Sequence, residues 1–596
     1  MSSQEKQWQV LPLISDEFVK KYPEYSRLVL QLLFNRGLTE RGEIEEFLNP
    51  LTFFKSPQPP LLKGEISFDP FLFNDMEAAV DLVIKHIKEG GKIVVYGDYD
   101  ADGVTASAVL FETLTILKGK VDVYIPDRVS EGYGLNKEAI DELKEEGARL
   151  IITVDNGIRN NEEIKYAKSL GIEVIVTDHH IPPPEDELPD CLIINPMTEG
   201  EKYPFKYLAG VGAAFKLAQG VIQKSKLAED DKKKLEERLL DLAAIGTVAD
   251  CVTALGENRI LIKKGLMVLN GQKRIGLNVL IKIAQINNNK KLDAWNISFQ
   301  IAPRLNSAGR MEHASSAFEL LTTKDRTEAE TISRWLNEKN YDRQKTTEEI
   351  VEHIVEQVDK LAKRGKLDNI IVAAAPPDAI WNEGVVGLVA GKISDKYYRP
   401  VIVLSRTEEG LKGSGRSIGE FNIIQAVEEC SEFLEKFGGH AQACGLSLKE
   451  KNIEKFKKKI LRIAEEKLKN ADLRPKIKIE AELELGELDE NLLNEVEKFS
   501  PFGQDNERPK FLSRACLIVD RINMGIDGQH VKLRLKGGNS GVISALGFGQ
   551  AEDWNHLRIG DKIDIVYYVE MNEFNGRREA QLKIVDIKKY NANTAN

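Results

Sequence analysis

Three closely spaced aspartates form the strongest chemical signal in the chain. Asp98, Asp100 and Asp102 follow directly after the apolar run at residues 93–96. Carboxylates this close together repel one another unless a cation lies between them. An EF-hand loop also begins with alternating aspartates, but its glycine and its final glutamate are absent here at the required offsets. The pattern therefore favours a metal site over a solvated acidic turn.

Residues of the same chemical type follow three further apolar runs. They are Asp155 after residues 151–154, Asp178, His179 and His180 after residues 174–177, and Asp250 after residues 239–245. The carboxyl ends of parallel strands line one crevice of an open sheet, so we expect these side chains to meet the first three aspartates there. Each one alone is as consistent with a surface turn. Four sets converging on one edge favour a common site.

The residue types indicate which metal the site would hold. Carboxylate oxygens combined with imidazole nitrogens suit Mn²⁺ or Mg²⁺, and the histidines favour manganese. The five cysteines are scattered along the chain, which argues against a structural zinc site. A ligand set of this size can hold two ions about 3.5–4 Å apart, which activate water and stabilise the attacking and leaving oxygens. This arrangement suits phosphoester hydrolysis.

The elements that position these residues follow from the hydrophobic pattern. Short apolar runs at 92–96, 121–125, 150–154 and 174–177 alternate with amphipathic segments such as 137–146 and 161–170. This alternation predicts an α/β domain with a doubly wound, mainly parallel sheet, which we place at residues 71–322. Residues 1–70 read as a helical N-terminal extension, with helical patterns at 17–33 and 40–48 and a breaker-rich boundary at 56–60.

The second half of the chain predicts three more parts. Residues 325–363 lack glycine and proline and carry apolar residues at helical spacing, so we expect a long connecting helix within 323–365. Runs at 369–375 and 400–404 indicate a smaller α/β domain at 366–450. A lysine-rich helix at 451–469 and a strand-rich end follow, which we assign together, as residues 451–596, to a helix and an OB-type β-barrel. In that barrel, the alternation over 531–536 places Lys532, Arg534 and Lys536 on one sheet face.

Composition limits the functional classes. A chain of 596 residues with 42% hydrophobic and 30% charged residues should form several folded, soluble domains. Its formal charge of −11 argues against a protein that coats nucleic acid by bulk attraction, although bound divalent cations are missing from that sum. The N-terminus shows no signal-peptide pattern, and no apolar stretch of about 18 residues occurs, so we expect a cytoplasmic protein without a membrane partner.

The ordered motifs resemble those of one family. They run collinearly over nearly the whole chain as YGDYDADGVT at 96–105, PDRVSEGYG at 126–134, VDNG at 154–157, TDHH at 177–180, GTVAD at 246–250, APRLNSAGR at 302–310, SGRS at 414–417, GGHAQACG at 438–445 and PFGQDN at 501–506. This series is similar to the RecJ-type exonucleases of the DHH phosphoesterase superfamily. The resemblance implies DHH, DHHA1 and OB domains, two divalent ions, and a single-stranded-DNA-specific exonuclease. It also implies a direction from 5′ to 3′, release of mononucleotides, and a role in DNA repair and recombination.

The resemblance also implies roles for individual residues. The implied metal ligands are Asp100, Asp102, Asp155, His179 and Asp250, with Asp155 bridging two ions. Asp98 and His180 join them as catalytic residues, and Asp98, Asp178 and His180 are expected to orient ligands or to contact phosphate.

Substrate contacts are expected on all three domains. By resemblance, Arg310 holds the terminal 5′ phosphate with help from Arg304 and Asn306, which fits the bidentate donors of guanidinium. The DHHA1 residues implied in substrate binding are Arg416, Ser417 and His440. On the barrel, Lys532 and Arg534 form a candidate track for a single strand. Tyr567, Tyr568 and Phe574 are expected either to stack bases there or to lie in the core.

Two other functions stay open from the sequence. Superfamily relatives cleave short oligonucleotides or dinucleotides, although such a phosphodiesterase would not need an OB domain. An inactive DNA-binding replication scaffold is the other alternative, against which the intact acidic motifs argue. The main interpretation adds a single-strand-binding protein and a helicase as candidate partners.

Overall fold

A computed structural model describes residues 5–49, 68–128, 130–286, 291–538, 541–574 and 577–591. The chain forms two compact units. One contains Val10–Asn337 and Lys478–Asn596, and the other contains Glu338–Ile477 with the residues up to Gln9. We describe each unit by itself.

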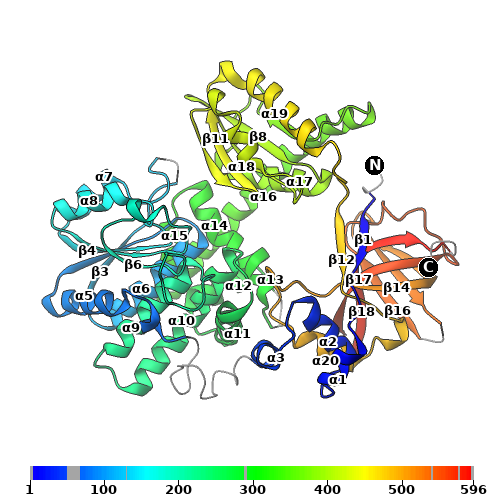
Figure 1. The fold of residues 1–596 in the computed structure, drawn as a ribbon, viewed down its shortest axis with the longest axis horizontal. Coiled ribbons are helices and arrows are strands. Elements are labelled where there is room, and N and C mark those ends of the chain that lie inside the picture. The colour runs from blue at the N-terminus through cyan, green and yellow to red at the C-terminus, as the bar shows by residue number, and fades with distance from the viewer. Residues whose placement is uncertain are drawn as a thin grey trace. The chain divides into compact units, whose positions relative to one another are not determined.

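The first unit is built around a five-stranded parallel sheet (Figure 1). Its strands are β2 (Lys92–Tyr96), β3 (Lys120–Tyr124), β4 (Ala148–Val154), β5 (Glu173–Thr177) and β6 (Leu192–Ile194), in the order β3-β2-β4-β5-β6. This confirms the predicted doubly wound parallel sheet. The strand order reverses between β2 and β4, and the crevice at such a switch point is where ligands bind in this architecture.

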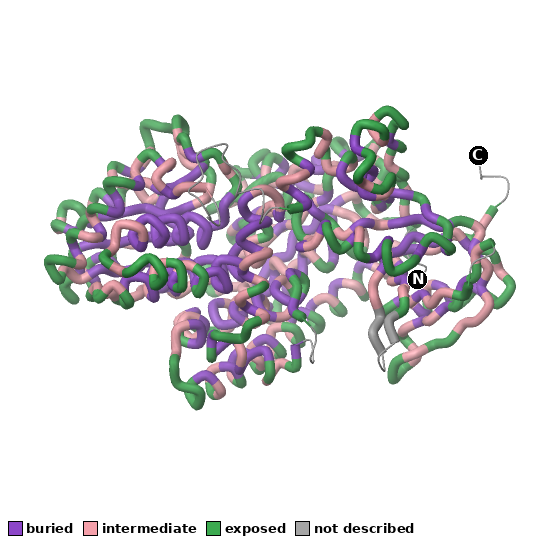
Figure 2. The backbone as a smooth tube through the Cα atoms, turned by 90° about the horizontal axis from the view of Figure 1, so that it is seen from below, coloured by how far each residue is buried: buried purple, intermediate pink, exposed green. Residues whose placement is uncertain are grey.

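Both faces of the sheet are apolar because helices cover both. On β2, Ile93 and Val95 pack with α5 (Met76–Glu89), α6 (Ala101–Ile116) and α9 (Gly210–Lys224). The alternate residues Val94 and Tyr96 pack with α7 (Lys137–Glu145) and α8 (Asn161–Ser169) on the opposite face (Figure 1). Strands β2, β4 and β5 are almost wholly buried, the class of residue drawn purple in Figure 2, whereas the edge strand β3 is exposed or half-buried. Burial on two faces explains the continuous apolar sequences of the three central strands.

A helical layer completes this part of the unit. It consists of α10 (Glu229–Ala249), α11 (Gly256–Asn270), α12 (Ile275–Ile283), α13 (Ala294–Asn296), the π-helical turn η3 (Ile297–Ile301), α14 (Ala302–Met311) and α15 (Ser315–Thr322). The buried guanidinium of Arg274 binds Glu112 on α6 and lies 2.9 Å from Asp241 on α10. A single cation therefore ties together the two helices whose ends carry predicted metal ligands.

The same unit contains a closed barrel. Its strands β14 (Phe511–Met524), β15 (His530–Lys536), β16 (Val542–Gly547), β18 (Arg577–Lys589) and β17 (Lys562–Phe574) pair in this order, and β14 also pairs with β17. That last pairing closes the barrel, as the OB-type prediction required. Along β15, residues 531, 533 and 535 are fully buried, whereas 532, 534 and 536 point outward.

The N-terminal helices pack into the core of the barrel. They are α1 (Asp16–Lys21), α2 (Arg27–Asn35) and α3 (Arg41–Leu48). The helical pattern expected over 17–33 is broken after Lys21, because the Ser26 side chain caps a new helix by accepting from the Val29 N–H. Strand β1 (Gln7–Val10) pairs with β12 (Lys476–Ile479). The boundary expected at 56–60 lies outside the described residues.

The second unit contains most of α16 (Arg326–Lys363), the predicted long helix, which begins in the first unit. Its sheet has the order β10 (Lys436–His440), β11 (Ala443–Leu448), β9 (Gly410–Arg416), β8 (Val401–Thr407) and β7 (Ile371–Ala374), with α17 (Glu383–Tyr397) and α18 (Ile423–Glu428). Helix α19 (Ile453–Leu468) buries Phe456 and Ile460 in the core of this sheet. The lysine-rich helix thus packs with the strands before it, whereas our expected division at 450 grouped it with the barrel.

Among the helices that the structure describes, none combines the length and the apolar character that crossing a membrane requires.

Candidate metal centre

The loop after β2 brings the first three aspartates together. Asp100 is the N-cap of α6, and its Oδ1 accepts from the N–H groups of Asp102 at 2.8 Å and Gly103 at 3.1 Å. A Cβ atom at Gly103 would lie 2.6 Å from the backbone oxygen of Asp98, so only glycine lets the loop fold this closely onto the helix. Asp102 then faces the site from the first turn of α6.

Helix α9 holds Asp102 from the opposite side. The N–H of Gly210 donates to Oδ2 of Asp102 at 2.7 Å, and that of Val211 donates to Oδ1 at 2.8 Å. These are free donors at a helix N-terminus, where an anion is favoured. The carboxylate is thereby fixed in orientation while it stays fully buried.

Asp155 occupies a strained position at the end of β4. Its φ is +62°, and its N–H donates to the carbonyl of Thr177 on β5 at 3.0 Å. Left-handed backbone is uncommon for a residue other than glycine and is typical of functional sites. The strain turns the carboxylate toward the crevice, where its Oδ1 is buried without a hydrogen-bond partner among the described residues.

Asp178, at the end of β5, organises the histidine pair. Its Oδ1 accepts from the N–H groups of His179 at 2.7 Å and His180 at 3.1 Å. The same oxygen lies 2.8 Å from Nδ1 of His180. Asp178 therefore fixes the orientation of the His180 ring through Nδ1.

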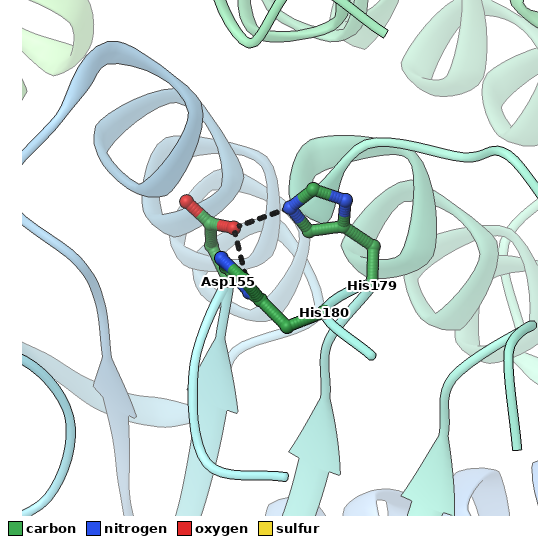
Figure 3. Close-up of side chains that lie close together, drawn as sticks. All are labelled: Asp155, His179 and His180. Atoms are coloured by element: carbon green, nitrogen blue, oxygen red, sulfur yellow. Dashed lines mark ion pairs between the residues drawn. The ribbon is translucent and has the colours of Figure 1, made fainter. Parts of the chain in front are cut away.

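The predicted ligands converge as expected from the sheet edge. The Nε2 atom of His179 lies 3.1 Å from Oδ1 of Asp155, 3.6 Å from Oδ2 of Asp250 and 4.0 Å from Oδ2 of Asp102. Figure 3 shows both histidine rings directed at Asp155, with Nδ1 of His180 3.9 Å from the same oxygen. The groups from four separate segments thus meet at one point.

Three overlapping sets can each hold a cation. They are Asp98, Asp100 and Asp155, then Asp102, His179 and Asp250, and finally Asp155, His179 and His180. Asp155 belongs to two of these sets, the position that a bridging ligand would have. Within the described residues, Asp98 Oδ1, Asp155 Oδ1 and His179 Nε2 are buried without a hydrogen-bond partner. Because such atoms are costly to bury, divalent cations fit this donor set.

The electrostatics of the site agree with this fit. Burial and the neighbouring aspartates raise the pKa of Asp102 to about 7 and that of Asp250 to about 9. For the same two reasons, the pKa values of Asp98 and Asp155 lie well above the ordinary value. Bound cations would reverse these shifts, since a nearby positive charge favours carboxylates.

The two histidines shift in opposite directions. Burial lowers the pKa of His179 to about 4, so its ring is neutral and can offer a lone pair to a metal. Burial also acts against protonation of His180, but the hydrogen bond and charge of Asp178 outweigh it and raise the pKa of His180 to about 9. His179 is therefore suited to bind a metal, whereas His180 carries a proton.

Of the residues expected to bind the terminal phosphate, Asn306 lies against the metal loop. Its Oδ1 accepts from the N–H of Ala101 at 2.6 Å. Arg310 follows one turn later on α14. Arg304 instead donates to Asn337 Oδ1 at 3.0 Å and to the Gln300 carbonyl at 2.7 Å, contacts that favour a structural role.

The second unit brings its three predicted residues to one end of its sheet. Arg416 pairs with Ala443, which also pairs with His440, so the two side chains stand on strands β9 and β10 around β11. His440 is exposed. The hydroxyl of Ser417 donates to the Phe421 carbonyl at 2.6 Å and supports the turn after β9.

The residues of the barrel that were predicted to contact the strand do not all lie on its surface. Lys532 and Arg534 stand on its outer surface. Tyr567 is fully buried, with its hydroxyl 2.8 Å from that of Ser513, so it belongs to the core and does not stack bases. Tyr568 is half-buried beneath the ammonium group of Lys510, and the Phe574 side chain lies outside the described residues.

Tyr133 is a site residue to which the sequence pattern gave no individual role. Its hydroxyl donates to the Asp155 carbonyl at 3.0 Å and lies 3.1 Å from Nδ1 of His180. The signal was its place between Gly132 and Gly134, both of which have positive φ. Glycines at such positions indicate a tightly turned loop that presents the residue between them.

Comparisons with known proteins agree over nearly the whole chain. Family models match at residues 92–247 (DHH family, N-terminal domain), 367–466 (DHHA1 domain) and 479–586 (RecJ OB domain). The chain is 38% identical over 562 residues to the single-stranded-DNA-specific exonuclease RecJ of Bacillus subtilis, covering 94% of this chain and 67% of that protein. It is 33% identical over 593 residues to the Escherichia coli protein of the same name, covering 96% of this chain and 97% of that protein.

Solved structures of RecJ have a similar fold. The crystal structure of RecJ from Thermus thermophilus in complex with Mn²⁺ is similar with a TM-score of 0.80 and 28% identity. That match covers 98% of this chain and 80% of the other. The Mg²⁺ complex of the same protein has a TM-score of 0.73 and 26% identity.

Proposed function

The chain belongs to the RecJ family of single-stranded-DNA-specific exonucleases, and we propose that it removes mononucleotides from the 5′ end of single-stranded DNA with two divalent metal ions. The observation that carries this proposal is the convergence of Asp98, Asp155 and His179, whose buried polar atoms lack partners among the described residues. Relatives of the family bind Mn²⁺ or Mg²⁺ in solved structures, which supports the same ions here.

The residues proposed to hold the ions form two groups around one shared carboxylate. Asp98 and Asp100 group with Asp155, and Asp102 and Asp250 group with His179, whose Nε2 lies 3.1 Å from Oδ1 of Asp155. Divalent ions bound there would activate a water and stabilise the charge that develops on the phosphate. Asp98, which we expected to be a catalytic residue that orients ligands or contacts phosphate, is in this proposal a ligand itself.

His180 is proposed to act on the substrate with its free ring nitrogen. Asp178 lies 2.8 Å from Nδ1, and the Tyr133 hydroxyl lies 3.1 Å from the same nitrogen. Nε2 is then the ring nitrogen left for the substrate, and the hydrogen bond and charge of Asp178 favour the protonated ring. A protonated imidazole can hold a phosphate oxygen or give a proton to the leaving oxygen.

The polarity is proposed to come from α14. Arg310, assisted by Asn306, would hold a terminal 5′ phosphate next to the metal loop, because guanidinium matches phosphate with paired donors. Arg416, Ser417 and His440 would contact the strand from the second unit. Lys532 and Arg534 would guide the incoming strand over the barrel. A role in DNA repair and recombination follows for such an enzyme.

The test compares labelled substrates in Mn²⁺. We expect mononucleotide release from 5′-phosphorylated single-stranded DNA, no digestion of the duplex, and loss of activity in Asp155→Ala. The matched control is Asp186→Ala, which removes an exposed carboxylate from a surface turn. Release from the 3′ end would contradict the proposed polarity.

The two alternatives give different results in the same assay. Cleavage confined to dinucleotides would indicate a short-nucleotide phosphodiesterase, and binding without hydrolysis would indicate a scaffold. The barrel, matched by the RecJ OB domain model, favours a long strand over a short nucleotide as substrate. The acidic residues that group with the histidines argue against an inactive scaffold.

The proposed setting is the cytoplasm, with a helicase that unwinds duplex DNA and a single-strand-binding protein that coats the single strand exposed by unwinding. Faster digestion of a duplex after both proteins are added would support these partners. An unchanged rate would contradict them.

A further inference from the structure

Asp250 is a proposed metal ligand whose side chain is directed by its own backbone. Among the described residues, no hydrogen bond holds its carboxylate, whose Oδ2 lies 3.6 Å from Nε2 of His179. Backbone N–H groups, by contrast, orient the carboxylates of Asp100 and Asp102. Asp250 is the C-cap of α10, where the helix ends in a turn. The position of its carboxylate therefore depends on how that turn is held.

The turn after Asp250 is strained. Cys251 has a φ of +58°, in the left-handed region. Such a conformation persists in a residue other than glycine only where the surrounding structure imposes it. Part of the support is local, because the Asn258 side chain donates to the Thr253 carbonyl at 3.0 Å. The rest comes from a segment far away in the sequence.

That segment is the loop at 498–506, which contains the PFGQDN motif and leads into the barrel. The N–H of Ala254 donates to the Gln504 carbonyl at 2.8 Å. A Cβ atom at Gly503 would lie only 3.1 Å from that of Ala254, so the loop lies directly against the turn. The next residue, Leu255, packs against the apolar core that the barrel shares with the N-terminal helices. The stretch that begins at Asp250 therefore ends against the barrel side of the unit.

Arg259 on α11 fixes this loop. Its side chain is 1% exposed, and no carboxylate pairs with it among the described residues. Its five N–H donors all bind carbonyl oxygens, at 2.9–3.3 Å, from Phe47, Lys498, Phe499, Ser500 and Pro501. Only a guanidinium offers so many donors in one plane, because a lysine has three. The pattern predicts a residue selected to hold a backbone in one conformation.

The loop is also fixed from within. The buried Asn506 donates from Nδ2 to the carbonyls of Phe499 and Pro501, both at 2.8 Å. Its Oδ1 accepts from Nε of Arg36 on α2 at 2.9 Å. Each polar group of the Asn506 amide is thus used to keep the loop in shape. The loop can therefore act as a rigid support for the turn that it contacts.

We propose that Arg259 and the 498–506 loop are positioning elements of the metal centre, which hold residues 250–254 so that Asp250 faces His179 and Asp102. This proposal rests on the function proposed above and adds a requirement of its metal site. Ligands must be held within about 0.5 Å of the productive geometry, so support for the backbone of Asp250 should affect metal affinity. The loop before the barrel would then serve metal binding as well as joining two domains.

The test measures metal binding directly. In Arg259→Met, isothermal titration calorimetry should show Mn²⁺ affinity reduced about tenfold or more at one site, the loss typical when a supporting residue of a metal site is removed. The matched control is Arg399→Met, which removes a guanidinium from the second unit that also donates to carbonyls, those of Tyr397, Tyr398 and Leu473. This control should keep the wild-type affinities.

A second variant leaves Arg259 intact. Gly503 does not have positive φ, so its backbone accepts alanine, but the added methyl group would press on Ala254. We expect Gly503→Ala to weaken Mn²⁺ binding at the same site by about threefold, with little change in the urea midpoint. If Arg259→Met does not fold, this variant decides, and wild-type affinity would then overturn the proposal.

Hydrogen exchange in the metal-free protein gives a readout without metal or substrate. The Ala254 N–H should be protected in the wild type and exchange faster in Arg259→Met, because its partner Gln504 lies on the released loop. Unchanged Mn²⁺ affinity in folded Arg259→Met would overturn the positioning role. An equal loss in Arg399→Met would overturn it too, since general instability would then explain both. If the wild type binds Mn²⁺ but digests no single-stranded DNA, the proposed function fails, while the titration still decides on the positioning role.

Discussion

The Nε2 atom of His179 lies 3.1 Å from Oδ1 of Asp155, and neither atom has a hydrogen-bond partner among the described residues. Burial lowers the pKa of the His179 imidazole to about 4, so the ring itself is neutral. Two electron-rich atoms this close need a positive charge between them, which a proton on Asp155 supplies in the metal-free protein and a bound cation would supply in its place. The relationship between these residues is therefore the basis of the first prediction.

Replacing Asp155 by asparagine should abolish tight metal binding. The amide keeps the size of the side chain but removes the negative charge that both ligand groups share. We expect Mn²⁺ affinity to fall at least 100-fold by isothermal titration calorimetry, with a smaller stoichiometry. The control is Asp141→Asn, which changes an exposed carboxylate hydrogen-bonded to Tyr166. Unchanged affinity and stoichiometry would contradict the bridging role.

The stability of the metal-free protein should fall as the pH rises. Asp102 titrates near its ordinary value of 3.8 when unfolded and at about 7 when folded, so between these values the folded state binds more protons. By linkage, the free energy of unfolding decreases with pH over that window. Urea denaturation at pH 5 and pH 8 would measure the difference. Asp102→Asn should flatten the slope, and saturating Mn²⁺ should reverse the order.

Asp178→Asn should lower the pKa of His180. Asp178 supplies the hydrogen bond and the largest of the charges that raise this pKa to about 9, so in the variant only the charges of Asp250 and Asp102 oppose burial and the pKa should fall. NMR titration of the metal-free protein would follow the ring directly. Loss of ligand orientation should also reduce activity about 10–100-fold. A His180 pKa that stays near 9 would show that other groups raise it.

Much of this site could be predicted from the sequence, because residues that follow the strands of a parallel sheet lie together at one edge of that sheet. Each ligand follows a short apolar run, and the carboxyl ends of β2, β4 and β5 share one edge. We predicted Asp250 by the same argument. It lies at the end of helix α10 rather than of a strand, but it groups with Asp102 and His179 at the same edge. The fold itself followed from the alternation of apolar runs and amphipathic segments.

The remaining features depend on contacts that no local pattern records. Tyr133 reaches the site through a loop conformation, and Tyr567 is buried because β17 pairs with both of its neighbours in the closed barrel. Helix α19 is lysine-rich, yet its apolar stripe packs on the preceding sheet. Hydrophobic spacing shows that such residues are buried, but only tertiary packing determines against which domain.

Arg274→Met should destabilise the first unit strongly. The guanidinium is nearly buried between Glu112 and Asp241, and its removal leaves Asp241 as a buried charge without a cation, whereas Glu112 keeps Arg238 at 3.2 Å. Breaking one side of a buried ion pair costs about 3–5 kcal/mol. Urea denaturation should show this loss, and the double variant R274M/D241N should recover most of it. If the double variant is no more stable than the single one, packing of the arginine stem, rather than charge, holds α6 and α10 together.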